Sequence, residues 1–155
     1  QFFGYLLLDA LIGNTDRHHE NWAYLRWPDK QMRTHYVIGP SFDHASSLGR
    51  ELLDTKREKI LAEERVEFYS NNGKGAIYEN QNSKYGLNPI ELLQYAHEKY
   101  PDLLSIWIER LKSVSPEKYA EVLSKIPDEF ISNKARTFAY TLLNVNLNKI
   151  VALSR

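Results

Sequence analysis

The sequence predicts a mainly α-helical single domain that carries one small β-hairpin near its amino-terminal end. Apolar residues recur at helical spacing in segments that cover most of the chain. Strand-forming residues gather in two short runs that flank a single turn. With 155 residues and 43% hydrophobic content, the chain can bury one sizeable core but is too short for two ordinary domains.

The first helix is predicted to begin at the second residue and to end at a glycine. The apolar positions that fit helical spacing are Phe2, Phe3, Leu6, Leu7, Ala10 and Leu11. Gly13 stands where a left-handed helix cap is favoured, and Asn14 continues the turn. The polar loop GNTDRHHENW (13–22) follows, with more chemically active side chains than a structural turn needs.

A β-hairpin is predicted after this loop. The runs NWAYLRW (21–27) and MRTHYVIG (32–39) are rich in aromatic and β-branched residues and flank the turn-forming PDKQ (28–31). A second polar loop, GPSFDHASSLG (39–49), comes next. We expect the aromatic residues of this region to pack within the hairpin; they are Trp22, Tyr24, Trp27 and Tyr36.

The rest of the chain is predicted to form a helical bundle. The charge-dense run at 50–68 favours a helix with a solvated face, and the run at 70–86, rich in Gly, Asn and Ser, favours a long loop. A capping-box signature predicts a helix start at Asn88, Pro89 and Glu91. A second helix start is predicted at Ser115, where Pro116 again takes the first helical position. The last helix begins at about Ser132, and its predicted inner side is Phe138, Ala139, Leu142, Leu143, Leu147 and Ile150.

Composition limits the classes of function. Twenty basic residues balance twenty acidic residues, so no net field favours nucleic acid or an anionic membrane surface. The absence of cysteine excludes disulfides and thiolate metal sites and agrees with a reducing cytoplasm, the expected location. No apolar run approaches the roughly 20 residues that cross a bilayer. The chain begins with Gln1, and we expect it to be a piece of a longer protein.

The polar loops contain one spacing that suits a specific chemistry. Asp16 precedes Asn21 by five positions, and Asp43 follows the hairpin. Phosphoryl transfer needs one carboxylate at the acceptor hydroxyl, and an amide and a second carboxylate to hold magnesium against nucleotide phosphates. A hairpin between the loops can bring them together. The alternative interpretation is that Asp16 and Asn21 only cap the loop through Asx turns.

The segments NTDRHHENW and GPSFD resemble the catalytic and metal-binding loops of HipA-like serine/threonine kinases, which share the DRHxxN order with phosphatidylinositol 3-kinase-type enzymes. The resemblance implies the carboxy-terminal lobe of a protein-kinase-like fold. Residues 1–49 would hold the catalytic helix, hairpin and loops, and residues 50–155 the helical bundle. It also implies Asp16 as the catalytic residue and Asn21 and Asp43 as ligands of Mg²⁺ and ATP, with Asn14 and His18 shaping the loop.

The resemblance further implies transfer of the ATP γ-phosphate to a protein Ser or Thr, in a toxin of a bacterial toxin-antitoxin system. The implied partner is a HipB-type helix-turn-helix antitoxin. The spacing itself leaves a lipid or small-molecule acceptor open. No glycine-rich loop or strand lysine precedes Asp16, so we expect the amino-terminal lobe to be absent and this fragment alone to be inactive.

Two other functions stay open at this stage. The first is a metal-dependent hydrolase or nuclease built from Asp16, His18, His19, Asp43 and His44, although HExxH spacing is absent. The second is a non-catalytic binding remnant. Arg17, His19 and Glu20 are expected either to lie in solvent or to contact phosphate.

Overall fold

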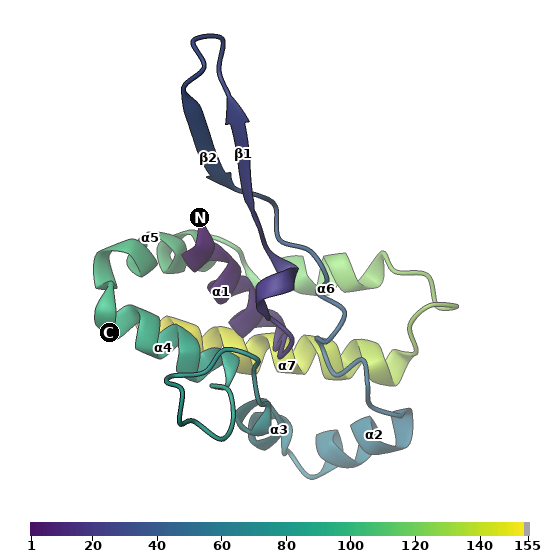
Figure 1. Ribbon diagram of the computed structural model, residues 1–155. Helices are drawn as coiled ribbons and strands as arrows, with labels where there is room; N and C mark the ends of the chain where they lie inside the picture. The colour runs from purple at the N-terminus through teal and green to yellow at the C-terminus, as the bar shows by residue number, and fades with distance from the viewer. Residues whose placement is uncertain (154–155) are drawn as a thin grey trace.

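A helical body with a projecting two-stranded hairpin forms the structure, a computed structural model that describes residues 1–153 (Figure 1). Its elements are α1 (Phe2–Ile12), the short 3-10 helix η1 (His19–Asn21), β1 (Tyr24–Pro28), β2 (Thr34–Ile38), α2 (Asp54–Ala62), α3 (Val66–Asn72), α4 (Pro89–Lys99), α5 (Pro101–Lys112), α6 (Pro116–Ser124) and α7 (Asn133–Ala152). The predicted mainly helical class with one hairpin is confirmed.

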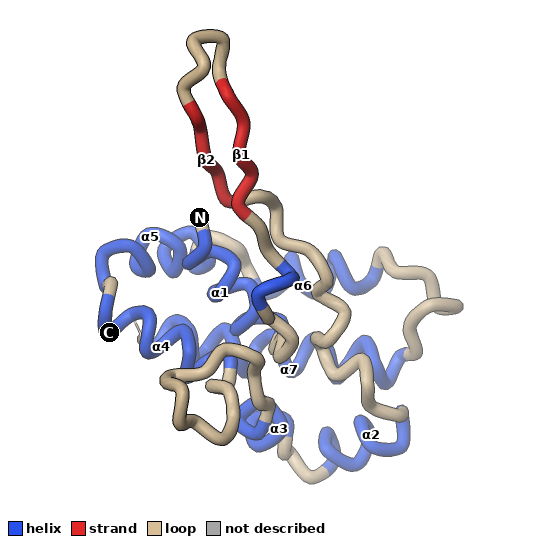
Figure 2. Tube along the Cα trace, viewed as in Figure 1, coloured by secondary structure: helices blue, strands red, loops and turns tan. Residues whose placement is uncertain are grey.

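The long helix α7 runs through the body and contacts α1, α2, α3 and α6 (Figure 2). Every residue predicted for its inner side is buried, and the Ser132 hydroxyl caps it by accepting from the Ala135 N–H. Helix α1 ends as predicted at Gly13, whose φ of 65° is left-handed. Within the described residues, neither α7 nor any other helix is long and apolar enough to span a membrane.

The helix predicted for residues 50–68 is wrong in its start and in its continuity. The chain first turns through Leu48 and Gly49, which both have positive φ, and α2 begins only at Asp54. A second break separates α2 from α3, where Glu64 has a φ of 53° that no right-handed helix accommodates. The loop predicted for 70–86 accordingly begins later, because α3 continues to Asn72.

The two predicted helix starts differ in their chemistry. Asn88 forms the predicted capping box, since its side chain accepts from the Ile90 N–H and Glu91 accepts from the Asn88 N–H. Ser115 occupies the corresponding position before Pro116 but makes no capping hydrogen bond. Hydrogen bonding from its own backbone N–H, and then from the Ser115 hydroxyl, lowers the pKa of the nearby Glu117 carboxyl.

The hairpin projects from the body and is not covered by it (Figure 1). Its strands pair antiparallel, with Tyr24 opposite Ile38 and Trp27 opposite His35, and the Trp27 and His35 rings stack at 5.7 Å. The expected packing of its aromatic residues is only partly correct, because Tyr24 and Tyr36 are exposed by 64% and 65%. Trp22 instead contacts Phe2 of α1, with ring centroids 4.8 Å apart.

We predict that Gly49→Ala destabilises the fold by roughly 2–4 kcal/mol. Gly49 has a φ of 68°, and an added Cβ would collide with the buried Phe138 ring of α7. Urea denaturation measures the loss. Gly39→Ala is the matched control, because its Cβ would first meet the flexible Leu25 side chain at 3.3 Å. Equal losses for both variants would show that the turn at Gly49 has no special constraint.

Candidate active site

A buried arginine lies at the centre of the polar loops. The Arg17 side chain is 3% exposed, and its Nε and Nη2 atoms donate to the two carboxylate oxygens of Asp9 at 2.7 and 2.8 Å. Such a two-point, charge-assisted contact fixes both groups. The expectation that Arg17 lies in solvent or contacts phosphate is therefore wrong, because Asp9 draws it into the body.

The same guanidinium joins the two loops. Arg17 Nη1 donates to the carbonyl of Asn21 at 2.7 Å and to the carbonyl of Phe42 at 3.4 Å. One nitrogen thus holds the end of the first loop next to the residue that precedes Asp43. A second link lies further along, where the Thr15 N–H donates to the Ser46 carbonyl at 3.3 Å. The loops on either side of the hairpin run together in space.

His44 extends this network toward the surface. Its Nδ1 lies 3.1 Å from Arg17 Nη2, and its Nε2 lies 3.1 Å from the Ser41 hydroxyl. Since Arg17 can only donate, we assign Nδ1 as the acceptor and place the ring proton on Nε2, facing Ser41. The side chain of His44 is thereby committed to holding the second loop.

The backbone of Asp16 is fixed, whereas its carboxylate is free. Its N–H donates to Asn14 Oδ1 at 3.1 Å, and its carbonyl accepts from Asn21 Nδ2 at 2.6 Å. Asn14 is itself buried and donates to Asp9 at 2.8 Å. The carboxylate of Asp16 is 46% exposed, and His18 Nε2 lies 3.9 Å from it, too far for a hydrogen bond. It can therefore receive a proton from an incoming group.

Asn21 and Asp43 retain oxygen atoms that suit a hard cation. Asn21 is buried, and its Nδ2 is committed to Asp16, which leaves Oδ1 without a hydrogen bond among the described residues. The carboxylate of Asp43 is exposed and likewise has no partner within residues 1–153. Its φ of 54° is unusual for a residue other than glycine and marks local strain. Carboxylate and amide oxygens fit magnesium.

The histidines do not assemble a transition-metal site. His18 Nδ1 accepts from the Glu20 N–H at 3.2 Å, and its ring lies 6.1 Å from that of His19 at an angle of 63°. In the described part of the chain, no three His, Asp, Glu or Cys side chains are grouped to hold a metal ion. His44 is committed to Arg17 and Ser41. His19 and Glu20 are exposed, in agreement with the first of the two expectations for them, and contact with phosphate stays a prediction.

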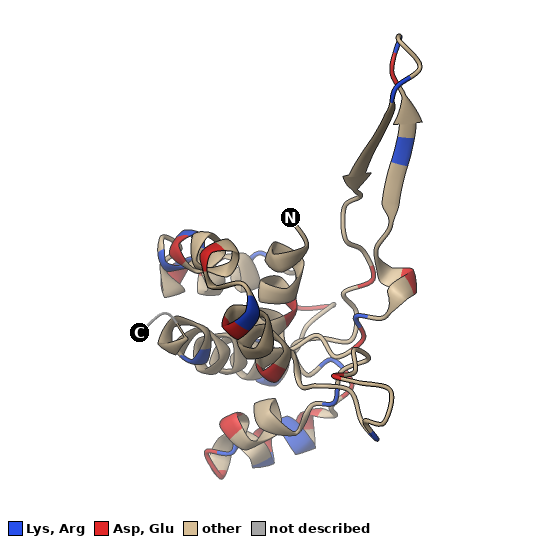
Figure 3. Cartoon of the chain, turned by 60° about the vertical axis from the view of Figure 1, so that its left-hand side comes forward, with Lys and Arg blue, Asp and Glu red and all other residues tan. Residues whose placement is uncertain are grey.

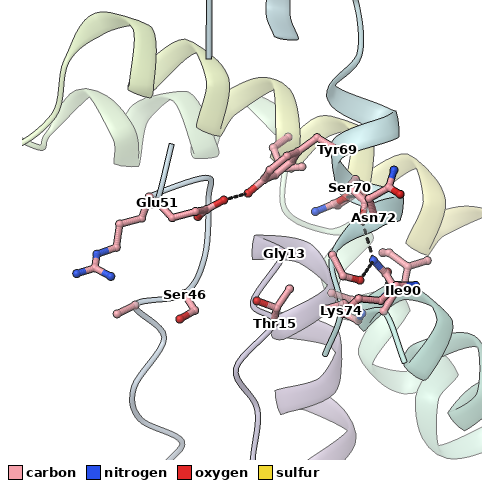
Figure 4. Close-up of a pocket in the computed structure, with 17 residues that line it drawn as sticks. Gly13, Thr15, Ser46, Glu51, Tyr69, Ser70, Asn72, Lys74 and Ile90 are labelled. Atoms are coloured by element: carbon pink, nitrogen blue, oxygen red, sulfur yellow. Dashed lines mark hydrogen bonds between the residues drawn. The ribbon is translucent and has the colours of Figure 1, made fainter. Parts of the chain in front are cut away.

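A pocket of about 350 Å³ opens beside the two loops (Figure 4). Figure 4 shows Ser46 and Glu51 on one side, Asn72 and Lys74 on the other, and Thr15 between them. The pocket is lined by residues next to the proposed catalytic set, but Asp16, Asn21 and Asp43 are not among them. It is therefore a separate recess adjoining the loops.

One wall of this pocket is held by a tyrosine. The Tyr69 hydroxyl donates to the Glu51 carboxylate, and burial together with this carboxylate raises the pKa of Tyr69 well above its usual range. Tyr69 therefore stays protonated and keeps Glu51 in place. Behind it, Asn146 bonds to Ser70 Oγ and to the Leu11 carbonyl, which joins α3, α7 and α1 beneath the pocket.

Comparison with known proteins supports a kinase-like fold. No protein-family model matches the sequence. The chain is 28% identical over 153 residues to the serine/threonine-protein kinase CtkA of Helicobacter pylori, a match that covers 97% of this chain and 44% of CtkA. The crystal structure of the H. pylori proinflammatory kinase CtkA superposes with a TM-score of 0.75 at 24% identity, over 99% of this chain and 50% of that one. The chain thus spans about half the length of this relative.

We predict that Arg17→Met costs about 3–5 kcal/mol of stability, because it leaves the Asp9 carboxylate buried without its counter-charge. Removing both partners, in Asp9→Leu with Arg17→Met, should cost less than the sum of the two single changes. Thermal and urea unfolding of the cycle provide the measurement. The exposed pair Arg33–Asp29, 2.8 Å apart, is the control, and Arg33→Met should cost less than about 1 kcal/mol. Additive losses in the cycle would contradict the coupling.

Proposed function

We propose that the chain is the carboxy-terminal catalytic lobe of a HipA-like kinase that transfers the γ-phosphate of ATP to a Ser or Thr of a protein substrate. One observation carries this proposal: Asp16, Asn21 and Asp43 lie on two loops that Arg17 holds together, and their side-chain oxygens accept no hydrogen bond from residues 1–153. Similarity to a serine/threonine kinase along nearly the whole chain supports it.

Asp16 is the proposed catalytic base. Its half-exposed carboxylate can accept the proton of an acceptor hydroxyl while its backbone is held by Asn14 and Asn21. Catalysis by positioning requires a catalytic group that is held in one orientation and is still accessible to the acceptor. The fixed backbone of Asp16 provides the orientation, and its half-exposed carboxylate provides the access. His18 shapes the loop by accepting from the Glu20 N–H, as its place in the resemblance implies.

Asn21 and Asp43 are the proposed magnesium ligands, through Oδ1 of the amide and the free carboxylate. When bound, magnesium–ATP supplies the phosphoryl group and a metal charge that offsets the charge developing on it. Asn21 is positioned for this role by its hydrogen bond to the Asp16 carbonyl. Asp43 is positioned by its neighbours, since Phe42 and His44 on either side both contact Arg17.

We further propose that the remaining contacts to ATP come from a second lobe. The chain matches 44% of CtkA, and none of its residues supplies a glycine-rich phosphate loop. The exposed hairpin lies on the side of the catalytic loops, where such a lobe would cover it (Figure 1). The toxin role and the HipB-type antitoxin partner are part of this proposal and depend on the HipA-like resemblance alone.

In the full-length protein, Asp16→Ala should reduce phosphate transfer by about a hundredfold or more while leaving magnesium–ATP binding nearly unchanged. Asp43→Ala should weaken binding and transfer together, because it removes a metal ligand. Radiolabelled transfer to protein and calorimetric binding separate the two effects. Near-normal transfer by Asp16→Ala would remove the role assigned to that carboxylate.

Residues 1–155 alone should bind magnesium–ATP weakly, because only part of the nucleotide site is present. Thermal unfolding with increasing magnesium–ATP tests this, since a ligand that binds the folded state raises the melting temperature. We expect a clear rise for the full-length protein and a negligible one for this chain. A rise of several degrees for residues 1–155 at micromolar nucleotide would show that the site is complete without a second lobe.

A further inference from the structure

The pocket beside the loops contains polar groups that the fold does not use. Within residues 1–153, the hydroxyls of Thr15 and Ser46 have no hydrogen-bond partner. The Asn72 side chain donates to the Phe68 carbonyl, which leaves its Oδ1 free. These atoms can bond the N–H and C=O groups of an extended peptide.

Two unpaired cations line the same pocket. Arg50 and Lys74 are exposed side chains that make no ion pair or hydrogen bond with any described residue. The third charged residue of the lining, Glu51, is engaged by the Tyr69 hydroxyl. The pocket therefore carries a net positive charge at its opening, although the formal charge of the whole chain is zero. Surface charges elsewhere are mixed, with acidic and basic residues interspersed (Figure 3).

The pocket lies next to the proposed base. Thr15 lines it, and Asp16 is the following residue, so the backbone of the proposed base adjoins the pocket, since consecutive Cα atoms lie about 3.8 Å apart. A volume of about 350 Å³ accommodates one or two side chains rather than a whole domain. Thr15 also lies close to Gly73, where an added Cβ would be 3.0 Å from Thr15 Cγ2, so the end of α3 packs near the catalytic loop.

We propose that this pocket binds an acidic residue that flanks the acceptor Ser or Thr of a protein substrate, and that Arg50 and Lys74 select it. The inference rests on the proposed kinase function and names the class of substrate. An anionic lipid headgroup would also bring negative charge. A peptide is favoured because the pocket offers free backbone-bonding groups beside the two cations.

A positional peptide library, phosphorylated by the full-length protein with radiolabelled ATP, tests the proposal without a known substrate. Wild-type protein should prefer Asp or Glu at one or two positions near the acceptor, by about fivefold over Ala. The double variant Arg50→Glu and Lys74→Glu should instead prefer Lys or Arg at the same positions. Both side chains are exposed, so the variant is expected to fold. The double control Lys56→Glu and Lys118→Glu makes the same change of charge at two exposed residues outside the pocket lining and should keep the acidic preference.

Binding provides a second readout that does not need catalysis. Acidic and basic peptides labelled with fluorescein are titrated with protein that carries Asp16→Ala, and binding is followed by anisotropy. The acidic peptide should bind more tightly when Arg50 and Lys74 are present, and the basic peptide when both are Glu. High salt should remove both preferences. Transfer or binding that ignores the charges at residues 50 and 74 would overturn the pocket assignment and leave the kinase proposal standing. If the wild-type protein bound peptides in a charge-dependent way but transferred no phosphate, the pocket assignment would stand and the kinase proposal would be overturned. Charge-dependent capture of anionic phospholipid vesicles in place of peptides would overturn the peptide assignment.

Discussion

The buried ion pair between Asp9 and Arg17 is the interaction on which the arrangement of the loops depends. Taking two charges out of water is costly, and the cost is offset only when each charge is fully hydrogen-bonded. Here both carboxylate oxygens of Asp9 accept from Arg17, and Oδ1 also accepts from Asn14. The remaining nitrogen of the guanidinium reaches the carbonyls of Asn21 and Phe42. Satisfying the buried charge therefore requires both loops to be in place.

This requirement links stability to the proposed chemistry. The Asn14 amide donates to Asp9, and His44 Nδ1 accepts from Arg17. These two atoms are therefore not available to bind a substrate. The carboxylates of Asp16 and Asp43 are not used by the ion pair, and both are accessible to solvent. The left-handed backbone of Asp43 costs roughly 1–2 kcal/mol. That strain is maintained because Phe42 and His44 on either side are both held by Arg17.

Much of the fold follows from local patterns in the sequence. The α1 stop at Gly13, the capping box at Asn88 and the inner side of α7 were predictable because each depends on residues within a few positions. The breaks before Asp54 and at Glu64 were not, because Leu48 and Glu64 are residue types that rarely adopt positive φ; at Glu64 the turn is closed by the Arg65 N–H, which donates to the Ile60 carbonyl. The site shows the same division. Spacing predicts the set Asp16, Asn21 and Asp43, whereas the contact between Arg17 and Asp9 is long-range. The sequence does contain one signal for this contact: Asp9 is the lone acid in the apolar run LLLDALI (6–12), and a buried carboxylate needs a hydrogen-bonding or charged partner.

The central claim is that Asn21 and Asp43 hold one metal ion against a nucleotide. Mn²⁺, added with ATP to the isotopically labelled full-length protein, broadens NMR signals of nuclei near the ion and so locates it directly. The account predicts strong broadening at Asn21, Phe42 and Asp43, with the hairpin tip at Lys30 and the helix α6 unaffected. Replacing Asp43 with Ala should remove the effect at Asn21 as well. Broadening at Asp43 that leaves Asn21 sharp, or broadening confined to other parts of the chain, would contradict a shared metal site.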